Sequence, residues 1–584
     1  MDVARIVGEI IGLVSIEQYG LVGVVSGERL LVSGLREGAT NVYLYDRGRL
    51  VRLNREPVSG VARPPRGSGR IVVFRDVARG REQHLIYTID PDEPGVERPL
   101  PGMEPARLLG VAYDDEVVVY AAATMEGVAL YAHRGGGGTP EKVADLPGIG
   151  FVADYRDGLA AGIIARPDEP GRFRLFTARI GEGSLRIHEP PEEGSVTQLA
   201  IAPDGGVVYA LETPRGARLY RAEHGGASGR LELPSPGLEE YGPYSFNYLG
   251  YTSRGELVAV ARREGRSRVF IDGRPVEAPE GIHGAVTDWG GGLAATYTSL
   301  RVPPRVVRLP GGEPLVAGEV PGYVADALGG VGFHWVESFD GSRVPTFTLE
   351  SRRAPRPGPA VVLVHGGPFA EDADMWNVFA ASLALLGFHV VMPNYRGSTG
   401  YGEEWRLRIV GDPCGGELED ITSAALWARS SGLASQLYIM GYSYGGYMTL
   451  CSLTRKPGLY RAGVAGAAVA DWGMMYELSD AAFRSFIDIM FAGRRELWRE
   501  RSPITYIDNL REPLCIIHPQ NDSRTPLKPI LRFMELASEK GKTFEAHIAP
   551  DMGHAVNTID DAIKLILPAA LFLARQKEAQ TTQG

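Results

Sequence analysis

The first part of the chain alternates short apolar runs with turn-forming sequences, as β-strands and their connections do. Between residues 20 and 320 the turns include PDGG, DGR and PGG. One motif recurs, an aliphatic residue usually followed by an aromatic one. Its second positions are Tyr45, Tyr87, Tyr131, Phe176, Tyr220, Phe270 and Val307. Successive copies lie 37 to 50 residues apart.

This spacing predicts a repeat architecture. Seven β-units of about 40–50 residues are typical of a seven-bladed β-propeller. A β-rich run precedes each copy, at residues 30–34, 71–74, 117–122, 159–163, 207–212, 257–263 and 293–298. Long amphipathic helices are almost lacking here, which argues against a helical solenoid. A large β-sandwich with accidental periodicity is the alternative.

From about residue 322 the pattern changes to apolar strands separated by helices. Residues 332–339 and 344–350 predict an antiparallel pair. Buried strands are expected at residues 360–367, 389–397, 436–443, 462–469, 513–520 and 544–550. Helices are expected at residues 376–387, 417–432, 529–541 and 555–576. This alternation predicts a mostly parallel, doubly wound sheet with both faces covered.

The N-terminus reads as an amphipathic helix, because Val3, Ile6, Val7, Ile10 and Val14 recur at helical spacing. It lacks the basic start and cleavage site of a secretory signal. Such a helix has no place in a propeller blade, so we expect it to pack on the second, α/β domain. The expected division is a helix in 1–20, a propeller in 21–321 and the α/β domain in 322–584.

Composition narrows the function. With 61 basic and 71 acidic residues the net charge is −10, which argues against nucleic-acid binding. No apolar run approaches the roughly 20 residues of a membrane span. We therefore expect a cytoplasmic protein. Asn and Gln together number only 16 of 584 residues, which hints at a thermophilic source, although an Arg-rich composition has a genomic explanation too. The three cysteines match no zinc-binding spacing.

The sequence Gly441-Tyr442-Ser443-Tyr444-Gly445 fits the nucleophile elbow G-x-S-x-G. Small residues permit the sharp strand-to-helix turn that exposes the Ser443 hydroxyl. A strand is predicted before the motif and a helix after it, as the elbow of an α/β-hydrolase requires, so we expect residues 322–584 to form an α/β-hydrolase catalytic domain. Ser443 is therefore the candidate nucleophile, with a structural glycine turn as the alternative.

A serine hydroxyl needs a base, and the hydrolase order places an acid and then a histidine downstream. Asp522 and His554 each follow a predicted strand. In this interpretation His554 takes the Ser443 proton and Asp522 orients the imidazole. The rivals are placed less well: His518 and His547 lie inside strands, His365 precedes glycines, Asp551 is too close to His554, and Asp471 comes one strand early.

An oxyanion hole needs two amide donors. The Tyr444 N–H, directly after the nucleophile, is one candidate. The Gly367 N–H of the loop HGGPF is the other, because glycine lets the backbone approach a substrate closely. A plain turn is the alternative for that loop.

Residues 471–491 are rich in aromatic and large aliphatic side chains. Trp472, Phe486 and Ile487, with Val469, are candidates for a hydrophobic specificity pocket, and a packing helix explains them equally well. Arg524 could hydrogen-bond a substrate carbonyl or form a surface ion pair.

These motifs together resemble the prolyl oligopeptidase family of serine peptidases, over nearly the whole chain. The specific segments are VESFDGSRVP (336–345), HGGP (365–368), NYRGSTGYGEEW (394–405), GYSYGGYM (441–448) and HPQNDSRTP (518–526). Within the family the chain is most similar to archaeal acylaminoacyl peptidases, which release an N-acylated amino acid from short blocked peptides.

The resemblance implies that Gly367 and Tyr444 form the oxyanion hole and that Arg524 binds the acyl-side carbonyl. It implies a propeller that admits only short peptides, a Cys414–Cys451 disulfide and a homodimer or higher homo-oligomer. Two buried free thiols are the alternative to the disulfide. We expect an acyl-enzyme, side activity on esters, and no metal or organic cofactor. The alternatives are a broad oligopeptidase or carboxylesterase, and a peptide-binding propeller on an inactive hydrolase scaffold.

Overall fold

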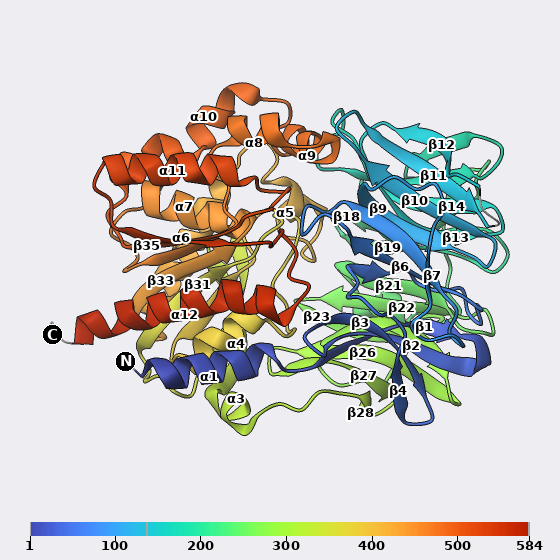
Figure 1. The fold of residues 1–584 in the computed structure, drawn as a ribbon, viewed down its shortest axis with the longest axis horizontal. Coiled ribbons are helices and arrows are strands. Elements are labelled where there is room, and N and C mark those ends of the chain that lie inside the picture. Colours follow the sequence, from blue (N-terminus) through green and yellow to red (C-terminus); the bar gives the residue numbers. More distant parts are fainter. Residues whose placement is uncertain (1, 136–137, 582–584) are drawn as a thin grey trace.

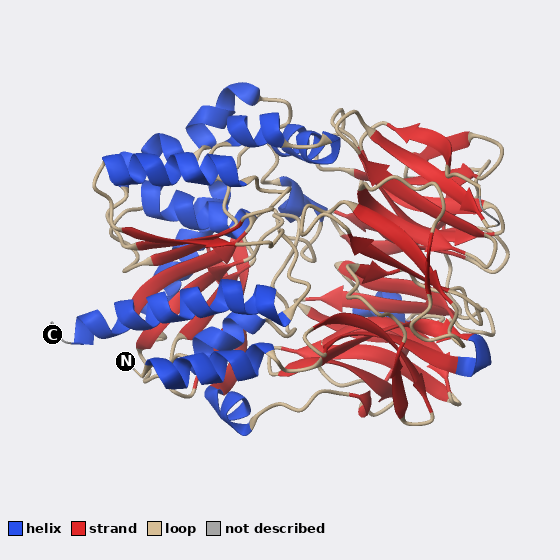
Figure 2. Cartoon of the chain, in the orientation of Figure 1, coloured by secondary structure: helices blue, strands red, loops and turns tan. Residues whose placement is uncertain are grey.

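The computed structural model describes residues 2–135 and 138–581, which form a ring of sheets beside a helix-covered sheet (Figure 1). Figure 2 shows the division: strands dominate one half of the molecule, and nearly all the helices gather in the other. The described residues form seven four-stranded sheets and one eight-stranded sheet. The predicted fold class, a seven-bladed β-propeller plus an α/β-hydrolase domain, is confirmed.

Each blade consists of four consecutive antiparallel strands. Blades one to four contain β1 (Gln18–Val25), β2 (Arg29–Arg36), β3 (Ala39–Asp46), β4 (Arg49–Arg52); β5 (Gly60–Val61), β6 (Ile71–Asp76), β7 (His84–Ile89), β8 (Glu97–Pro99); β9 (Arg107–Tyr113), β10 (Val117–Ala123), β11 (Val128–Arg134), β12 (Glu141–Leu146); and β13 (Ile149–Arg156), β14 (Leu159–Ala165), β15 (Phe173–Arg179), β16 (Ser184–His188). A short 3-10 turn, Ser26–Glu28, connects the first two strands.

The remaining blades follow the same order. Blades five to seven contain β17 (Ser195–Ile201), β18 (Val207–Thr213), β19 (Gly216–Ala222), β20 (Ser228–Arg230); β21 (Ser245–Tyr251), β22 (Leu257–Arg263), β23 (Arg266–Ile271), β24 (Arg274–Val276); and β25 (Ile282–Trp289), β26 (Gly292–Ser299), β27 (Val302–Leu309), β28 (Glu313–Val316). The short helix α2 (Gly237–Tyr241) lies between the fifth and sixth blades.

The recurring motif lies in the third strand of every blade, and the β-rich run before it lies in the second strand. Strands β10 and β18 are buried at every position. Neighbouring blades cover both faces of these strands, so an apolar residue is favoured at each position rather than at every other one. The repeat visible in the sequence is therefore the packing of blade against blade.

The ring closes by packing between the first and last blades, without exchange of a strand. Strand β1 packs against the last blade, where Tyr19 and Leu21 share a hydrophobic cluster with Ala294 and Val306. Each of these two blades keeps its own four consecutive strands. Burial of side chains therefore holds the ring shut at this seam.

The hydrolase sheet has the order β29-β30-β32-β31-β33-β34-β35-β36. Its strands are β29 (Leu328–Glu337), β30 (Arg343–Ser351), β31 (Gly358–Val364), β32 (His389–Pro393), β33 (Ala434–Tyr442), β34 (Gly463–Gly466), β35 (Leu514–Pro519) and β36 (Phe544–Ala549). Strands β31 to β36 pair in parallel, and β30 pairs antiparallel with both of its neighbours.

Helices cover both faces of this sheet. They are α3 (Gly322–Ala327), α4 (Val378–Leu385), α5 (Glu403–Leu407), α6 (Gly416–Ser430), α7 (Tyr444–Arg455), α8 (Trp472–Leu478), α9 (Ala481–Met490), α10 (Trp498–Arg501), α11 (Leu527–Glu539) and α12 (Ile559–Thr581), with 3-10 turns at Arg495–Leu497 and Pro503–Asn509. The predicted helix at 555–576 begins later, because Thr558 Oγ1 and the Asp561 carboxylate accept each other's backbone N–H groups and cap it.

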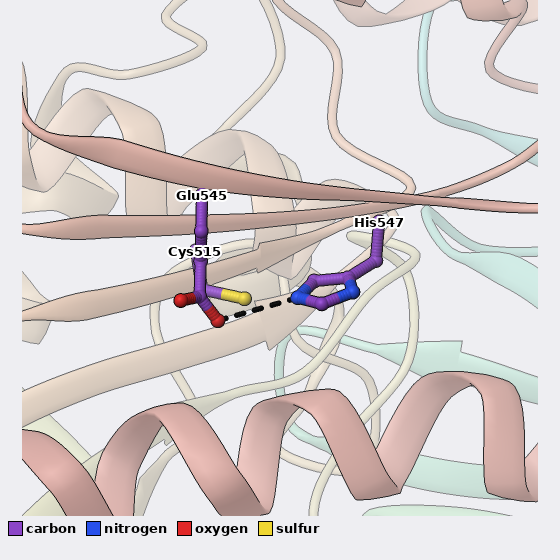
Figure 3. Close-up of side chains that lie close together, drawn as sticks. All are labelled: Cys515, Glu545 and His547. Atoms are coloured by element: carbon purple, nitrogen blue, oxygen red, sulfur yellow. Dashed lines mark hydrogen bonds and ion pairs between the residues drawn. The ribbon is translucent and has the colours of Figure 1, made fainter.

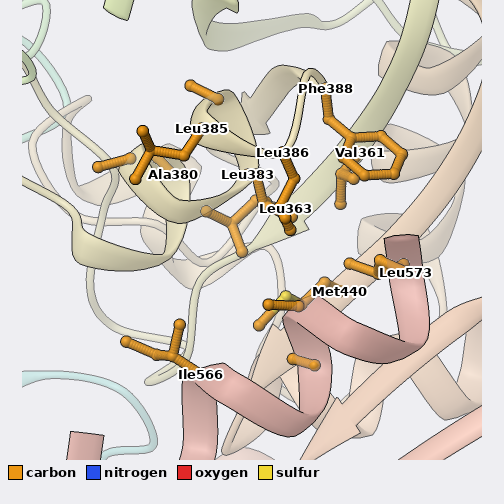
Figure 4. Close-up of a cluster of buried hydrophobic side chains, with 14 of the residues drawn as sticks. Val361, Leu363, Ala380, Leu383, Leu385, Leu386, Phe388, Met440, Ile566 and Leu573 are labelled. Atoms are coloured by element: carbon orange, nitrogen blue, oxygen red, sulfur yellow. The ribbon is translucent and has the colours of Figure 1, made fainter. Parts of the chain in front are cut away.

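The sheet divides its side chains between two cores with a period of two. Val361 and Leu363 of β31 face α4 and α12, whereas Ala360, Val362 and Val364 face α6 and α7. Figure 4 shows the first core, in which Leu383 of α4 and Ile566 of α12 lie close to the sheet. This two-sided cover fixes the strand ends that carry the site.

The N-terminal helix α1 (Val3–Val14) lies along the hydrolase domain beside α12 and α4 (Figure 1). Its buried side chains include Ile6, Ile10 and Val14, which belong to the same core as α12. Val3 is 45% exposed. Among the described residues, no helix has the length and hydropathy needed to cross a membrane.

Candidate active site

Ser443 stands at the tight turn between β33 and α7, with a backbone φ of 60° that non-glycine residues seldom adopt. Glycines on either side make this turn sterically feasible. A Cβ on Gly441 would lie 2.3 Å from backbone atoms of Gly445, and one on Gly445 would lie 2.0 Å from the Val364 carbonyl oxygen. The strand, turn and helix of the elbow therefore lift the Ser443 side chain above the carboxyl edge of the sheet.

His554 lies in the loop between β36 and α12, and its Nε2 is 2.9 Å from Ser443 Oγ. The Tyr442 hydroxyl donates a hydrogen bond of 2.9 Å to the His554 carbonyl oxygen, and the two rings are in contact. The residue before the nucleophile thus supports the loop that carries the histidine.

Asp522 follows β35, and its Oδ2 lies 2.7 Å from His554 Nδ1. The amides of Arg524 and Thr525 donate to Oδ1 at 2.9 and 2.8 Å, and the Thr525 hydroxyl donates to Oδ2 at 2.8 Å. Burial alone would raise the pKa of Asp522, but the charge of His554 and these hydrogen bonds outweigh burial and lower it to about 2. The carboxylate is therefore ionised at neutral pH.

Two backbone segments border Ser443 where a developing oxyanion would lie. Tyr444 is the first residue of α7, so its N–H has no partner within the helix. The glycine loop after β31 lies against the elbow, since a Cβ on Gly366 would be 3.2 Å from Ser443 Cβ and 3.7 Å from the Tyr444 nitrogen. Gly367, with a φ of 118°, is the next residue of that loop.

His365 anchors the glycine loop from below. Its ring stacks on the Tyr395 ring, with the ring centroids 4.4 Å apart. Its Nδ1 lies 2.7 Å from the Gly366 carbonyl oxygen, and its Nε2 lies 2.8 Å from Ser398 Oγ. Burial lowers the pKa of His365 to about 4, so the ring is neutral at pH 7. This agrees with its interpretation as a loop-ordering residue rather than the catalytic base.

Arg524 leaves the Asp522 loop and reaches the propeller. Its Nε lies 3.0 and 2.9 Å from the two carboxylate oxygens of Glu82, between β6 and β7. Arg107 of β9 pairs with the same carboxylate and also with Asp480. Burial raises the pKa of Glu82, but the hydrogen bonds and charges of Arg524 and Arg107 prevail and lower it to about 2. Two arginines and two carboxylates thus form an electrically balanced cluster beside the candidate triad.

The predicted pocket residues lie in packed surroundings. Val469, Trp472 and Ile487 are buried in the core that also contains α7, and the Trp472 ring contacts Tyr447. Phe486 is partly buried and packs against both this core and the propeller core of the third and fourth blades. That these residues contribute to substrate selection stays a prediction.

The rival groups are engaged elsewhere. His518 Nε2 lies 2.8 Å from the Thr525 carbonyl oxygen, and Asp471 caps α8 by accepting the Met474 N–H. Asp551 is exposed beside Arg79 of the propeller.

Cys414 and Cys451 form a disulfide that ties the segment before α6 to helix α7, with their Cα atoms 6.4 Å apart.

Two family descriptions match the two halves of this architecture. Residues 31–307 match the acylamino-acid-releasing enzyme-like N-terminal domain, and residues 375–579 match the prolyl oligopeptidase family. Together with the curated relatives, these matches make the chain a serine hydrolase whose residues 375–579 have the catalytic domain of the prolyl oligopeptidase family. The family resemblance read from the sequence motifs is thereby confirmed.

Individual relatives agree with this membership. The dipeptidyl aminopeptidase BIII of Pseudoxanthomonas mexicana is 32% identical over 213 residues, which are 35% of this chain and 31% of that protein. The human acylamino-acid-releasing enzyme is 28% identical over 226 residues, 37% of this chain and 31% of that protein. The similar segment thus covers about a third of each curated relative.

Solved structures share the fold over nearly the whole chain. A puromycin hydrolase superposes with a TM-score of 0.80 at 19% identity, covering 97% of this chain and 96% of that one. An acylaminoacyl peptidase of Pyrococcus horikoshii superposes with a TM-score of 0.69 at 16% identity, covering 95% and 96%.

The structure adds residues that the sequence reading did not single out. Glu82 and Arg107 come from the propeller, 442 positions before Arg524 and 373 positions before Asp480 respectively, and no local pattern marks them. Tyr442 and Thr525 lie inside the motifs around Ser443 and Asp522. Their position in the chain, close to the candidate triad residues, was the signal that could have pointed to them.

Proposed function

We propose that this chain is a serine exopeptidase that hydrolyses short N-acylated peptides and releases an N-acyl amino acid. Simple esters would be cleaved as a side reaction, because the same acyl-enzyme forms from them. The proposal rests on family membership, on the arrangement of Ser443, His554 and Asp522, and on the charge balance beside them. A homodimer or higher homo-oligomer also stays a prediction.

The observation that favours a blocked substrate is the engagement of Glu82. A carboxylate near the nucleophile could hold the ammonium group of a free amino terminus. Here Arg107 and Arg524 both pair with that carboxylate, so its charge is already neutralised. An uncharged acyl group beside an arginine fork suits this environment better than an ammonium group does.

In the proposed reaction Ser443 Oγ attacks the carbonyl carbon of the N-acylated residue, and His554 Nε2 takes the hydroxyl proton. Asp522 keeps Nδ1 protonated and stabilises the imidazolium. The carbonyl oxygen becomes an oxyanion, which the N–H groups of Tyr444 and Gly367 stabilise.

The tetrahedral intermediate then collapses. The peptide C–N bond breaks, and His554 returns its proton to the leaving amine, so the shortened peptide departs with a free amino terminus. Water attacks the resulting ester, with His554 as the base, and the N-acyl amino acid leaves as Ser443 regains its proton. In both half-reactions His554 is the group that takes the proton and returns it.

The proposed restriction to short peptides follows from how closely the propeller covers the histidine loop. A Cβ on Gly553 would lie 1.8 Å from the Gly80 carbonyl oxygen, so the two backbones touch next to His554. This contact supports short peptides rather than folded proteins as the proposed substrates.

Product analysis tests the proposal. The enzyme is incubated with an N-acetylated pentapeptide and with the same peptide bearing a free amino terminus, and products are identified by mass spectrometry. We expect N-acetyl amino acid plus the tetrapeptide from the first substrate, and no product with Ser443→Ala. Internal cleavage would favour the broad oligopeptidase instead, and ester cleavage without peptide cleavage would favour the carboxylesterase.

A further inference from the structure

A second group of reactive side chains lies at the edge of the hydrolase sheet, away from the Ser443 elbow. Cys515 is on β35, and Glu545 and His547 are on the edge strand β36. One ligand atom from each of the three lies within 4.8 Å of the others. Figure 3 shows the three side chains converging on the same face of the sheet, above helix α12.

The strand register produces this convergence. Cys515 pairs directly with Glu545 in the parallel β35–β36 ladder, and His547 lies two residues further along β36. Residues two apart on a strand project from the same face. Cys515 packs in the core shared with α12, so all three side chains project toward that helix.

The carboxylate is already oriented by its neighbours. Arg575 of α12 pairs with Glu545 Oε2, and His547 Nε2 lies 3.2 Å from Glu545 Oε1. The Cys515 thiol is buried, and it is the one free thiol, because Cys414 and Cys451 are joined. His547 and Glu545 are partly exposed, with side chains 42% and 33% accessible, which gives an ion a way in from solvent.

We propose that Cys515, Glu545 and His547 bind a zinc ion. Thiolate, imidazole and carboxylate are the three ligand types that Zn²⁺ takes from proteins, and a water molecule would complete the tetrahedron. As the zinc–sulfur bond forms, the thiol proton passes to solvent, and neither partner changes oxidation state. Arg575 acts as the outer partner that holds the Glu545 carboxylate in place.

Such an ion would clamp the two strands that lead to the acid and the base. Strand β35 ends at Pro519, just before Asp522, and β36 ends at Ala549, just before His554. Joining the strands resists their separation at β36, which is the last strand of this sheet among the described residues. The expected effect is a higher thermal midpoint, because the ion binds the folded chain in preference to the unfolded one.

Cobalt substitution tests the site on the full-length protein without reference to activity. Metal-free protein is titrated with Co²⁺, and the near-ultraviolet thiolate-to-cobalt band is followed; zinc then displaces the cobalt. We expect one equivalent per chain, no band in Cys515→Ala, and at least about tenfold weaker binding in His547→Ala and Arg575→Gln. His224→Ala, a part-buried histidine of the propeller, should bind like the parent.

His547→Ala keeps the test valid if removal of the buried thiol impairs folding, since the His547 side chain is largely at the surface. The proposal is overturned if excess cobalt produces no thiolate band. It is equally overturned if the affinity is unchanged in His547→Ala. Neither result bears on the serine hydrolase chemistry, which uses none of these residues.

Discussion

Arg524 of the hydrolase domain and Glu82 of the propeller form a bidentate ion pair across the domain interface, at 3.0 and 2.9 Å from Arg524 Nε. Arg524 is two residues after Asp522 in the chain. The pair therefore links the position of the propeller to the loop that carries Asp522, the candidate catalytic acid.

The first prediction concerns this pair. Glu82→Gln leaves the buried guanidinium of Arg107 with less countercharge, and breaking a buried ion pair costs about 3–5 kcal/mol. We expect a lower thermal midpoint and a raised KM for N-acyl substrates with kcat largely retained, because Arg524 loses its fixed position. Steady-state kinetics and thermal unfolding measure both effects.

The control for this variant is Glu93→Gln, which removes an exposed ion pair with Arg98 on the propeller surface. Exposed pairs contribute little, so its midpoint and KM should match the parent. If Glu82→Gln also behaves like the parent, the pair does not position Arg524.

The second prediction separates Asp522 from its rival. Asp522→Asn keeps the size of the side chain but no longer stabilises the His554 imidazolium, so kcat should fall by about 10⁴. Asp551→Asn, at an exposed position three residues before His554, should change kcat less than twofold. A comparable loss in both variants would contradict the assigned acid.

The third prediction is a pH dependence of stability. Glu371 is buried near the propeller residue Arg262, and burial raises its pKa to about 7. An unfolded glutamate titrates near pH 4.3, so between these values the folded chain holds a proton that the unfolded chain has released. The free energy of unfolding then falls as pH rises, by up to about 1.4 kcal/mol per pH unit.

Glu371→Gln has no such proton. When the two proteins are measured in parallel, the thermal midpoint of the variant minus that of the parent should therefore increase as the pH is raised from 5 to 7. The exposed Glu539→Gln should track the parent throughout this range. A difference between Glu371→Gln and the parent that is independent of pH would refute the raised pKa.

The fourth prediction compares two glycines. Gly445→Ala places a methyl group 2.0 Å from the Val364 carbonyl oxygen, which the packed elbow cannot accommodate, so activity should be lost and the midpoint lowered. Gly8 lies on helix α1, where an added Cβ would meet no neighbouring atom within 4 Å. Gly8→Ala should therefore keep full activity and gain up to about 1 kcal/mol of stability. Normal activity in Gly445→Ala would mean that the elbow is looser than its contacts indicate.

The fold could be predicted because its signals are local. Each third strand carries the same short motif, as at Tyr45 and Tyr220, and the hydrolase strands are short apolar runs between helices. The start of α12 was missed because the capping exchange between Thr558 and Asp561 involves only two polar side chains inside a longer periodic stretch.

The candidate triad could also be named from the sequence, because the elbow and the order of strand-end residues are chain-local features. The partner of Arg524 could not, since Glu82 is 442 positions away and only the placement of the two domains brings it near. The surroundings of Trp472 were likewise undecided, because an aromatic-rich segment gives the same pattern whether it lines a pocket or fills a core.

The most direct test of the central claim is a paired chromogenic assay. It compares kcat/KM for N-acetyl-leucine p-nitroanilide and leucine p-nitroanilide, with Ser443→Ala as the blank. We predict at least about a tenfold preference for the acetylated compound, because the charge of Glu82 is already neutralised by two arginines. A preference for the free amine would contradict the proposed specificity for blocked substrates and would indicate that a carboxylate of the propeller receives the ammonium group.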